Sequence, residues 1–135
     1  MPEHAQTTVA HLTLTKSGAQ PYVERREYML PLTVGWLRRN FHEDRSWLVQ
    51  AMIAPLAPNG KVLPHIDAGA FYRGRARHHL VITSASGCWF RCGDENITMH
   101  QGQLWWFDNS IEHACSNLLP NQPRTHLIFD TEPLA

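Results

Sequence analysis

The sequence lacks the features that mark several large classes of protein. It carries no net charge, because 12 lysines and arginines balance 12 aspartates and glutamates. No overall positive field would therefore draw it to nucleic acid or to an anionic membrane. No apolar run has the length of a membrane-spanning helix, and the N-terminus lacks the charged-then-apolar pattern of a signal peptide. We expect a soluble, cytoplasmic protein with neither a nucleic-acid nor a membrane partner.

Cysteine is scarce as well. The three cysteines, Cys88, Cys92 and Cys115, are too few and odd in number for a disulfide framework. Reduced, partly buried thiols are the simpler expectation. The chain also has no internal repeat, no low-complexity tract and no linker. With 135 residues, of which 43% are apolar, it suits one compact domain around one core.

Short strands separated by turn residues dominate what is present. The pattern predicts strands over residues 7–15, 22–30, 47–56, 76–83, 87–92, 96–99, 103–107, 113–118 and 125–129. A helix is predicted over residues 32–41, although Gly35 weakens it. Regular turns between short strands are typical of a mainly β, antiparallel sandwich or barrel with one or two short helices. Immunoglobulin-like, jelly-roll and cupin-like folds all fit this pattern.

Histidine is abundant, with nine in the chain, and three residues suggest a metal site. His65 and Asp67 are two positions apart, so an extended segment presents both side chains on one face. His113 follows several strands later, where a rolled double sheet can bring a strand back to face the first. Two imidazoles and one carboxylate that leave coordination positions open are diagnostic of non-haem Fe(II) oxygenases. In a histidine-rich chain, however, an H-x-D pair also arises by chance.

Arginines add a second element to this pattern. Arg124, at the start of the last predicted strand, could clamp a carboxylate of 2-oxoglutarate in a bidentate pair. The alternative is an exposed charge at a strand end. Strand alternation puts Arg75, Arg77 and His79 on one face, which suits a polar barrel interior that receives carboxylates. The alternative for that face is ordinary solvation.

These residues carry a resemblance. Residues 63–67, 75–80 and 106–113, together with Asn117 and residues 124–130, resemble the aspartyl/asparaginyl β-hydroxylase family of Fe(II)/2-oxoglutarate-dependent oxygenases. The most specific part is Phe107-Asp108-Asn109-Ser110 running into Glu112-His113. The resemblance covers about half of the chain, and the first sixty residues contain no recognisable motif. It implies a double-stranded β-helix, which is the jelly-roll, cupin-like fold.

The resemblance also implies roles for individual residues. His65 and His113 would be iron ligands, His79 would contact 2-oxoglutarate, and Arg124 would hold its distal carboxylate. Arg77 and Arg75 would bind the substrate. The best-known animal member lacks a carboxylate at the place of Asp67, whereas bacterial relatives acting on lipid A have one. We therefore expect Asp67 to be a third metal ligand.

Taken together, these features predict a single oxygenase domain over residues 1–135, with 1–6 a loose tail and 60–130 carrying the metal and co-substrate motifs. It would use Fe(II), 2-oxoglutarate and dioxygen to hydroxylate an unactivated carbon of an amino-acid, peptidyl or other carboxylate-bearing substrate, releasing succinate and carbon dioxide. The sequence shows neither the helical substrate domain nor the membrane anchor of some relatives, so the family name does not give the substrate. An exposed edge strand near the N-terminus could pair two subunits into a homodimer.

Two alternatives remain at this stage. One is a cupin-like metal-binding protein, such as an isomerase or a sensor, which would need the metal ligands but not Arg124. The other is a β-sandwich interaction module without metal, in which the histidines are incidental.

Overall fold

The fold is built almost entirely from strands. The computed structural model describes residues 10–14, 36, 39, 46–70 and 72–133. Within them the strands are β1 (Ala10–Leu14), β2 (Ser46–Leu56), β3 (Lys61–His65), β4 (Ala76–Thr83), β5 (Cys88–Cys92), β6 (Glu95–Ile97), β7 (Leu104–Trp106), β8 (His113–Asn117) and β9 (Arg124–Pro133). None of the described residues belongs to a helix with the length and hydrophobicity needed to cross a membrane.

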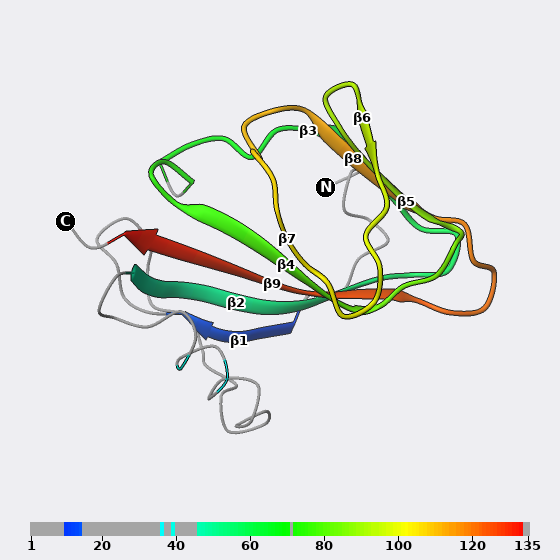
Figure 1. The fold of residues 1–135 in the computed structure, drawn as a ribbon, viewed down its shortest axis with the longest axis horizontal. Helices are drawn as coiled ribbons and strands as arrows, with labels where there is room; N and C mark the ends of the chain where they lie inside the picture. Colours follow the sequence, from blue (N-terminus) through cyan, green and yellow to red (C-terminus); the bar gives the residue numbers. More distant parts are fainter. Residues whose placement is uncertain (1–9, 15–35, 37–38, 40–45, 71, 134–135) are drawn as a thin grey trace.

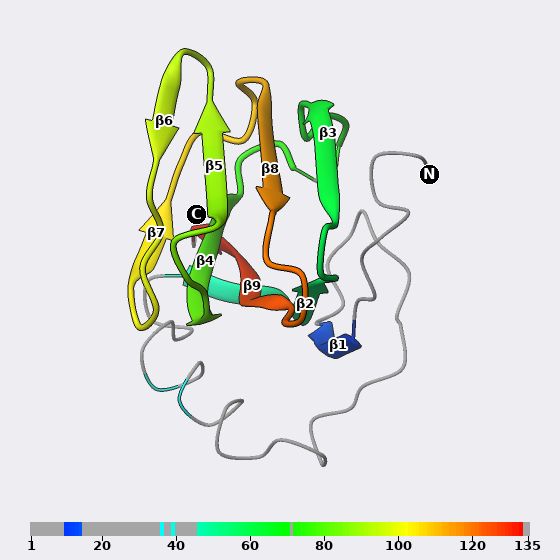
Figure 2. The ribbon, with the colours of Figure 1, turned by 90° about the vertical axis from the view of Figure 1, so that its right-hand side faces the viewer.

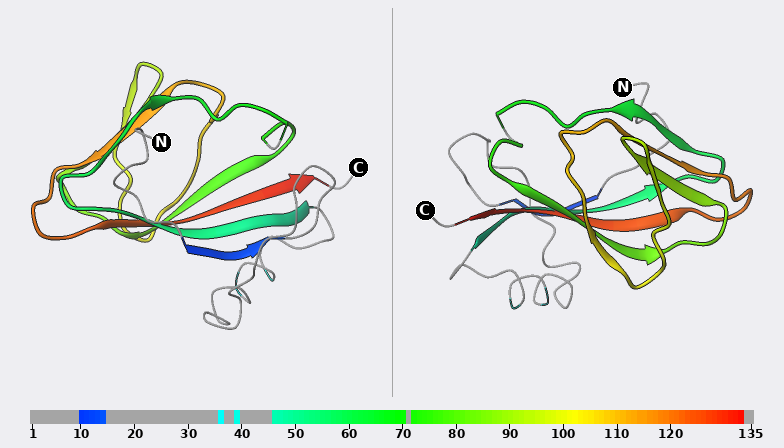
Figure 3. Two further views of the ribbon diagram at one scale, coloured as in Figure 1. Left: turned by 180° about the vertical axis from the view of Figure 1, so that it is seen from behind. Right: turned by 45° about the horizontal axis from the view of Figure 1, so that its top comes forward.

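Two antiparallel sheets lie face to face. The larger sheet has the strand order β1-β2-β9-β4-β7, and the smaller sheet has the order β3-β8-β5-β6. Figure 1 shows them as two layers, and Figure 2 looks onto the smaller one. From β2 to β5 and again from β6 to β9, successive strands alternate between the two layers, which Figure 3 shows from two further directions. This arrangement confirms the predicted jelly-roll, cupin-like fold.

Most predicted strands are present, and one was missed. Strand β4 has the predicted bounds of residues 76–83. Strand β3 was not predicted, because it contains Pro64 and its sequence, KVLPH, does not alternate between apolar and polar residues. Proline has no N–H for the ladder and is tolerated at a sheet edge, which is where β3 lies. The strand predicted over 22–30 lies outside the described residues, and of the helix predicted over 32–41 only Trp36 and Arg39 are described, both in helical conformation.

Apolar side chains fill two layers of the molecule. Between the sheets lies a cluster drawn from both of them, which contains Leu56, Val81, Phe90, Met99, Phe107 and Cys115. On the outer face of the larger sheet, Ala51, Leu127 and Phe129 form a second cluster, with Trp36, Ile53 and Leu80 packed against it. The inner face of the larger sheet is therefore only partly apolar, and polar side chains occupy the rest of it.

Asn117, at the end of β8, joins three segments of backbone. The residue is fully buried. Its Nδ2 donates to the carbonyl oxygens of Leu56 at 3.1 Å and Gln122 at 2.9 Å, and its Oδ1 accepts from the backbone N–H of Leu119 at 3.0 Å. Its own backbone N–H donates to the carbonyl of Gly60 at 2.8 Å. Asn117 therefore fixes the connections at this end of the sandwich and does not serve the metal site.

We expect Asn117→Ala to destabilise the protein by about 2–3 kcal/mol, because buried carbonyl and N–H groups would lose their partners. Urea unfolding measures this change. Asn96→Ala, at an exposed position in β6, is the matched control and should change the free energy of unfolding by less than about 0.5 kcal/mol. Equal effects of the two substitutions would contradict a structural role for Asn117.

Candidate metal centre

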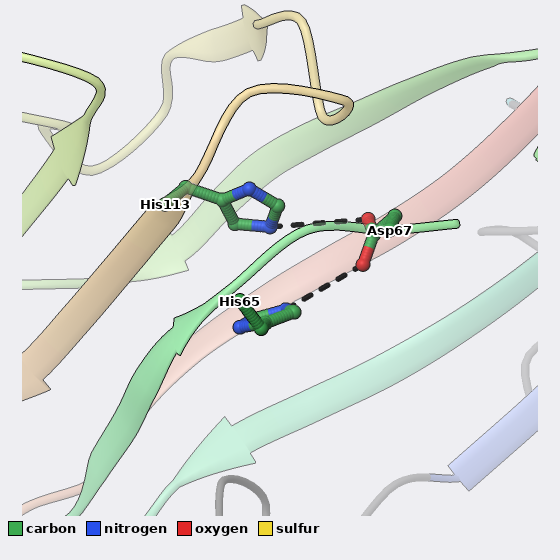
Figure 4. A group of neighbouring side chains, drawn as sticks. All are labelled: His65, Asp67 and His113. Atoms are coloured by element: carbon green, nitrogen blue, oxygen red, sulfur yellow. Dashed lines mark ion pairs between the residues drawn. The ribbon is translucent and has the colours of Figure 1, made fainter.

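The three residues predicted to bind metal lie together. His65 ends β3 and His113 begins β8, and the two are direct cross-strand partners with ring centroids 4.4 Å apart. Asp67 lies just beyond β3 and turns back toward both rings, as Figure 4 shows. His65 Nε2 is 3.5 Å from Asp67 Oδ1, and His113 Nε2 is 3.9 Å from Asp67 Oδ2. One donor atom from each residue lies within 4.8 Å of the others.

Both imidazoles are oriented by the backbone in the same way. His65 Nδ1 lies 2.8 Å from the carbonyl oxygen of Leu63, and His113 Nδ1 lies 2.8 Å from that of Ile111. A carbonyl can only accept, so each Nδ1 carries the proton and each Nε2 presents a lone pair. Burial lowers the pKa of His113, outweighing the hydrogen bond to the Ile111 carbonyl that raises it. Two neutral imidazole nitrogens and one carboxylate form a donor set that fits a divalent first-row metal.

Asp67 is held by a turn that precedes β8. Its backbone N–H donates to the carbonyl of Asn109, and the Asn109 side-chain amide donates to Asp67 Oδ2, both at 2.9 Å. Asp108 shapes this turn by accepting hydrogen bonds from the backbone N–H and the hydroxyl of Ser110. Those bonds lower the pKa of Asp108. Residues 106–113, part of the resemblance to the hydroxylase family, thus contain both His113 and Asn109, which positions Asp67.

Loss of the Asn109 amide should weaken metal binding. We expect Asn109→Ala to raise the dissociation constant for Fe(II) by about 10–100-fold, the usual effect of removing a group that orients a ligand. Anaerobic calorimetric titration of metal-free protein measures this constant. Asn121→Ala, at an exposed turn position, is the control and should bind like the parent. An unchanged constant in Asn109→Ala would show that Asp67 keeps its orientation without the amide.

The arginines predicted to bind substrate both have acidic partners. Arg77 forms a bidentate pair with Asp130, with Nε to Oδ1 at 2.8 Å and Nη2 to Oδ2 at 2.9 Å. Its Nη1 is also 3.6 Å from Asp67 Oδ2. Arg75 Nε donates to Glu132 at 3.0 Å. Arg77 therefore links the carboxylate of Asp67 to β9, and a contact of either arginine with substrate stays a prediction.

Arg124 and His79 lie deep between the sheets. Arg124 is only 7% exposed, so the alternative of a solvated charge at a strand end is wrong. Its Nη1 donates to the Sγ atom of Cys115 at 3.4 Å, and its Nε has no hydrogen-bond partner among the described residues. His79 is buried and lies edge-on to another buried imidazole, that of His126. Burial lowers the pKa of His79 well below its ordinary value.

His126 is the residue that sequence reasoning missed. It is 1% exposed, and its Nδ1 lies 3.0 Å from His79 Nδ1. Arg124, His126 and Asp130 occupy alternate positions of β9 and contact groups between the sheets, whereas Leu127 and Phe129 pack on the outer face. The sequence indicated only that His126 shares a strand face with Arg124, which does not distinguish it from an ordinary strand histidine.

Known proteins resemble this chain in sequence and in fold. The sequence profile of the aspartyl/asparaginyl beta-hydroxylase family matches residues 4–133. L-proline cis-4-hydroxylase of Rhizobium meliloti (strain 1021) is 30% identical over 94 residues, which is 70% of this chain and 33% of that protein. This chain thus spans about a third of the length of that relative.

Two solved structures share the fold at low sequence identity. A predicted oxalate decarboxylase of Thermotoga maritima has a TM-score of 0.53 at 14% identity, with 95% of this chain and 81% of the other covered. The cupin domain of a transcriptional regulator of the XRE family from Enterobacter cloacae has a TM-score of 0.52 at 15% identity, with 96% and 99% covered. At this identity the likeness is one of fold alone.

Proposed function

The chain belongs to the aspartyl/asparaginyl β-hydroxylase family, and we propose that it is an Fe(II)- and 2-oxoglutarate-dependent dioxygenase. It would hydroxylate an unactivated carbon of an amino-acid, peptidyl or other carboxylate-bearing substrate and release succinate and carbon dioxide. The similarity to a proline hydroxylase supports an amino-acid substrate. Neutral overall charge supports the absence of a nucleic-acid partner.

One arrangement carries this proposal. The donor atoms of His65, Asp67 and His113 lie within 4.8 Å of one another. On the opposite sheet, between the layers, Arg124 is a buried cation with no carboxylate within ion-pair distance among the described residues. Burial of a guanidinium without an anionic partner lowers the stability of the fold, so its presence here indicates that it binds an anionic ligand. The three metal-binding candidates on one sheet and Arg124 on the other suit a ligand that chelates a metal at one end and carries a carboxylate at the other.

The chain's own residues would bind and orient the reactants. His65, Asp67 and His113 would hold Fe(II), with both imidazoles fixed by backbone carbonyls and Asp67 fixed by Asn109. Arg124 would hold the distal carboxylate of 2-oxoglutarate in a bidentate pair. Iron with its co-substrates supplies the oxidising chemistry. The apolar rings of Phe90 and Phe107, each close to His113, would exclude water beside the metal.

Anaerobic titration with Fe(II) and then 2-oxoglutarate tests the proposal. We expect a weak charge-transfer band in the visible spectrum that needs both additions and is absent in Arg124→Ala. If Fe(II) binds but 2-oxoglutarate changes nothing, the cupin-like isomerase or sensor is the better assignment, since it needs no Arg124. If neither binds, the cluster of His65, Asp67 and His113 is a coincidence and the β-sandwich interaction module takes its place.

A further inference from the structure

Two buried polar atoms on β9 lack hydrogen-bond partners and lie on the same face. Arg124 and His126 are two positions apart on one strand, so their side chains leave the same side of the sheet. Arg124 Nε and His126 Nε2 are both buried without a partner among the described residues. Buried polar atoms are nearly always satisfied, so two neighbouring exceptions indicate a place for a polar ligand.

Cys115 does not supply that partner. Its Sγ is the acceptor for Arg124 Nη1 at 3.4 Å, and a thiol is a weak acceptor without a charge to match the guanidinium. Burial raises the pKa of Cys115, and this outweighs the opposite effect of Arg124. The thiol therefore stays neutral, and the positive charge beside His126 is still available to an anion.

His126 and His79 form a hydrogen-bonded pair of neutral rings. Their Nδ1 atoms are 3.0 Å apart and the rings are nearly perpendicular, with an interplanar angle of 88°. Burial, and after it the charge of Arg124, lowers the pKa of His126 to about 2. One Nδ1 must donate and the other must accept. Since each neutral imidazole carries one proton, only the ring whose Nδ1 accepts can have a proton on Nε2.

A series of contacts connects the pair to the metal group on one side and to Arg124 on the other. The rings of His113 and Phe107 are 5.0 Å apart, and those of Phe107 and His79 are 5.1 Å apart. His79 contacts His126, which follows Arg124 two positions later on the same face of β9. A ligand that reaches from the metal to Arg124 would therefore pass beside the His79–His126 pair.

We propose that His126 binds the distal carboxylate of the 2-oxo acid together with Arg124, donating from Nε2–H, and that His79 fixes this tautomer by donating from its Nδ1–H. This inference rests on the proposed function, because it assumes that a dicarboxylic 2-oxo acid binds. A carboxylate can only accept, so it would be repelled by a lone pair on His126 Nε2 and attracted by a proton there. Ligand binding and the tautomer of the pair are therefore coupled.

Binding measurements on three variants test this role. 2-Oxoglutarate and 2-oxobutyrate, which lacks the distal carboxylate, are titrated anaerobically into Fe(II)-loaded protein and followed by calorimetry. His126→Leu should raise the dissociation constant of 2-oxoglutarate by about tenfold to a hundredfold, the value of a hydrogen bond to a charged group. The constant of 2-oxobutyrate should be nearly unchanged. His126→Gln keeps an N–H near the position of Nε2 and should bind 2-oxoglutarate more tightly than His126→Leu.

His78→Leu is the matched control. This histidine is the neighbour of His79 on β4, but its ring packs against Phe129 on the outer face of the sheet, with centroids 4.9 Å apart. It should bind both acids as the parent does. Equal weakening of both acids in His126→Leu, or no weakening of either, would overturn the inference. If the parent protein itself binds neither acid, the proposed function fails instead, so the two failures are distinguishable.

The tautomer can be observed directly in the parent protein, which covers the case in which His126→Leu does not fold. Proton–nitrogen correlation spectra of ¹⁵N-histidine-labelled protein, loaded with diamagnetic Zn(II), report which ring nitrogen carries the proton. With 2-oxoglutarate bound, we expect His126 to be protonated at Nε2 and His79 at Nδ1. A His126 ring protonated at Nδ1 in that complex would refute the proposed donor.

Discussion

Replacing His113 with alanine is expected to weaken Fe(II) binding by a factor of a few hundred and to abolish turnover. Structural zinc sites with four ligands bind with about 10–16 kcal/mol, which is about 2.5–4 kcal/mol for each ligand. His113 supplies one of three donors, and no other histidine among the described residues joins the group within 4.8 Å. Calorimetric titration of metal-free protein with Fe(II) under anaerobic conditions gives the change in affinity.

The matched control is His100→Ala, because His100 is exposed and lies outside the metal group. It should bind Fe(II) as tightly as the parent. Asp67→Ala in the same assay tests the third ligand. A loss similar to that of His113→Ala would support coordination by Asp67, whereas a much smaller loss would mean that the two histidines alone hold the metal. Retained Fe(II) affinity in His113→Ala would contradict the assignment of the site.

The metal group could be found from the sequence because its geometry is local or follows from the fold. The H-x-D spacing needs only an extended backbone, and the return of His113 needs only a double sheet. The orienting contact of Asn109 with Asp67 could not be found, because it joins two loops whose approach depends on the register of β3 with β8. His126 was missed for a different reason. A histidine in an apolar strand is ordinary, and only the contact with His79 distinguishes it.

The C-terminal end of β9 could not be predicted from the sequence either. The strand was predicted to end at residue 129, where the apolar pattern stops, but it continues to Pro133. The extra residues stay in the sheet because Asp130 and Glu132 pair with Arg77 and Arg75 across the β4–β9 ladder. Hydrophobic periodicity detects strands by their apolar face, so a strand end held by ion pairs is invisible to it.

The second prediction with a large expected effect concerns stability and the ion pair between Arg77 and Asp130. We expect Asp130→Asn to lower the free energy of unfolding by about 3–5 kcal/mol, because the buried guanidinium of Arg77 loses its bidentate carboxylate and keeps only that of Asp67, 3.6 Å from Nη1. The side chains of Arg77 and Asp130 are 12% and 2% exposed, and Asp130 also accepts a hydrogen bond from Gln50 at 3.1 Å. Although burial lowers the pKa of Arg77, the hydrogen bonds and charge of Asp130 raise it above its ordinary value. Asp130→Asn removes those raising effects, but a guanidinium is not deprotonated in proteins, so Arg77 stays charged in the variant.

Urea unfolding of metal-free protein measures this loss without a contribution from metal binding. Glu132→Gln is the matched control. It removes the neighbouring ion pair between Glu132 on β9 and Arg75, which directly precedes β4, and the side chain of Glu132 is 42% exposed. It should cost less than about 1 kcal/mol. The double variant Arg77→Met with Asp130→Leu removes both charges and should recover most of the stability lost in Asp130→Asn. If Asp130→Asn costs no more than Glu132→Gln, the pair does not stabilise the fold, and the charge of Arg77 is compensated in another way.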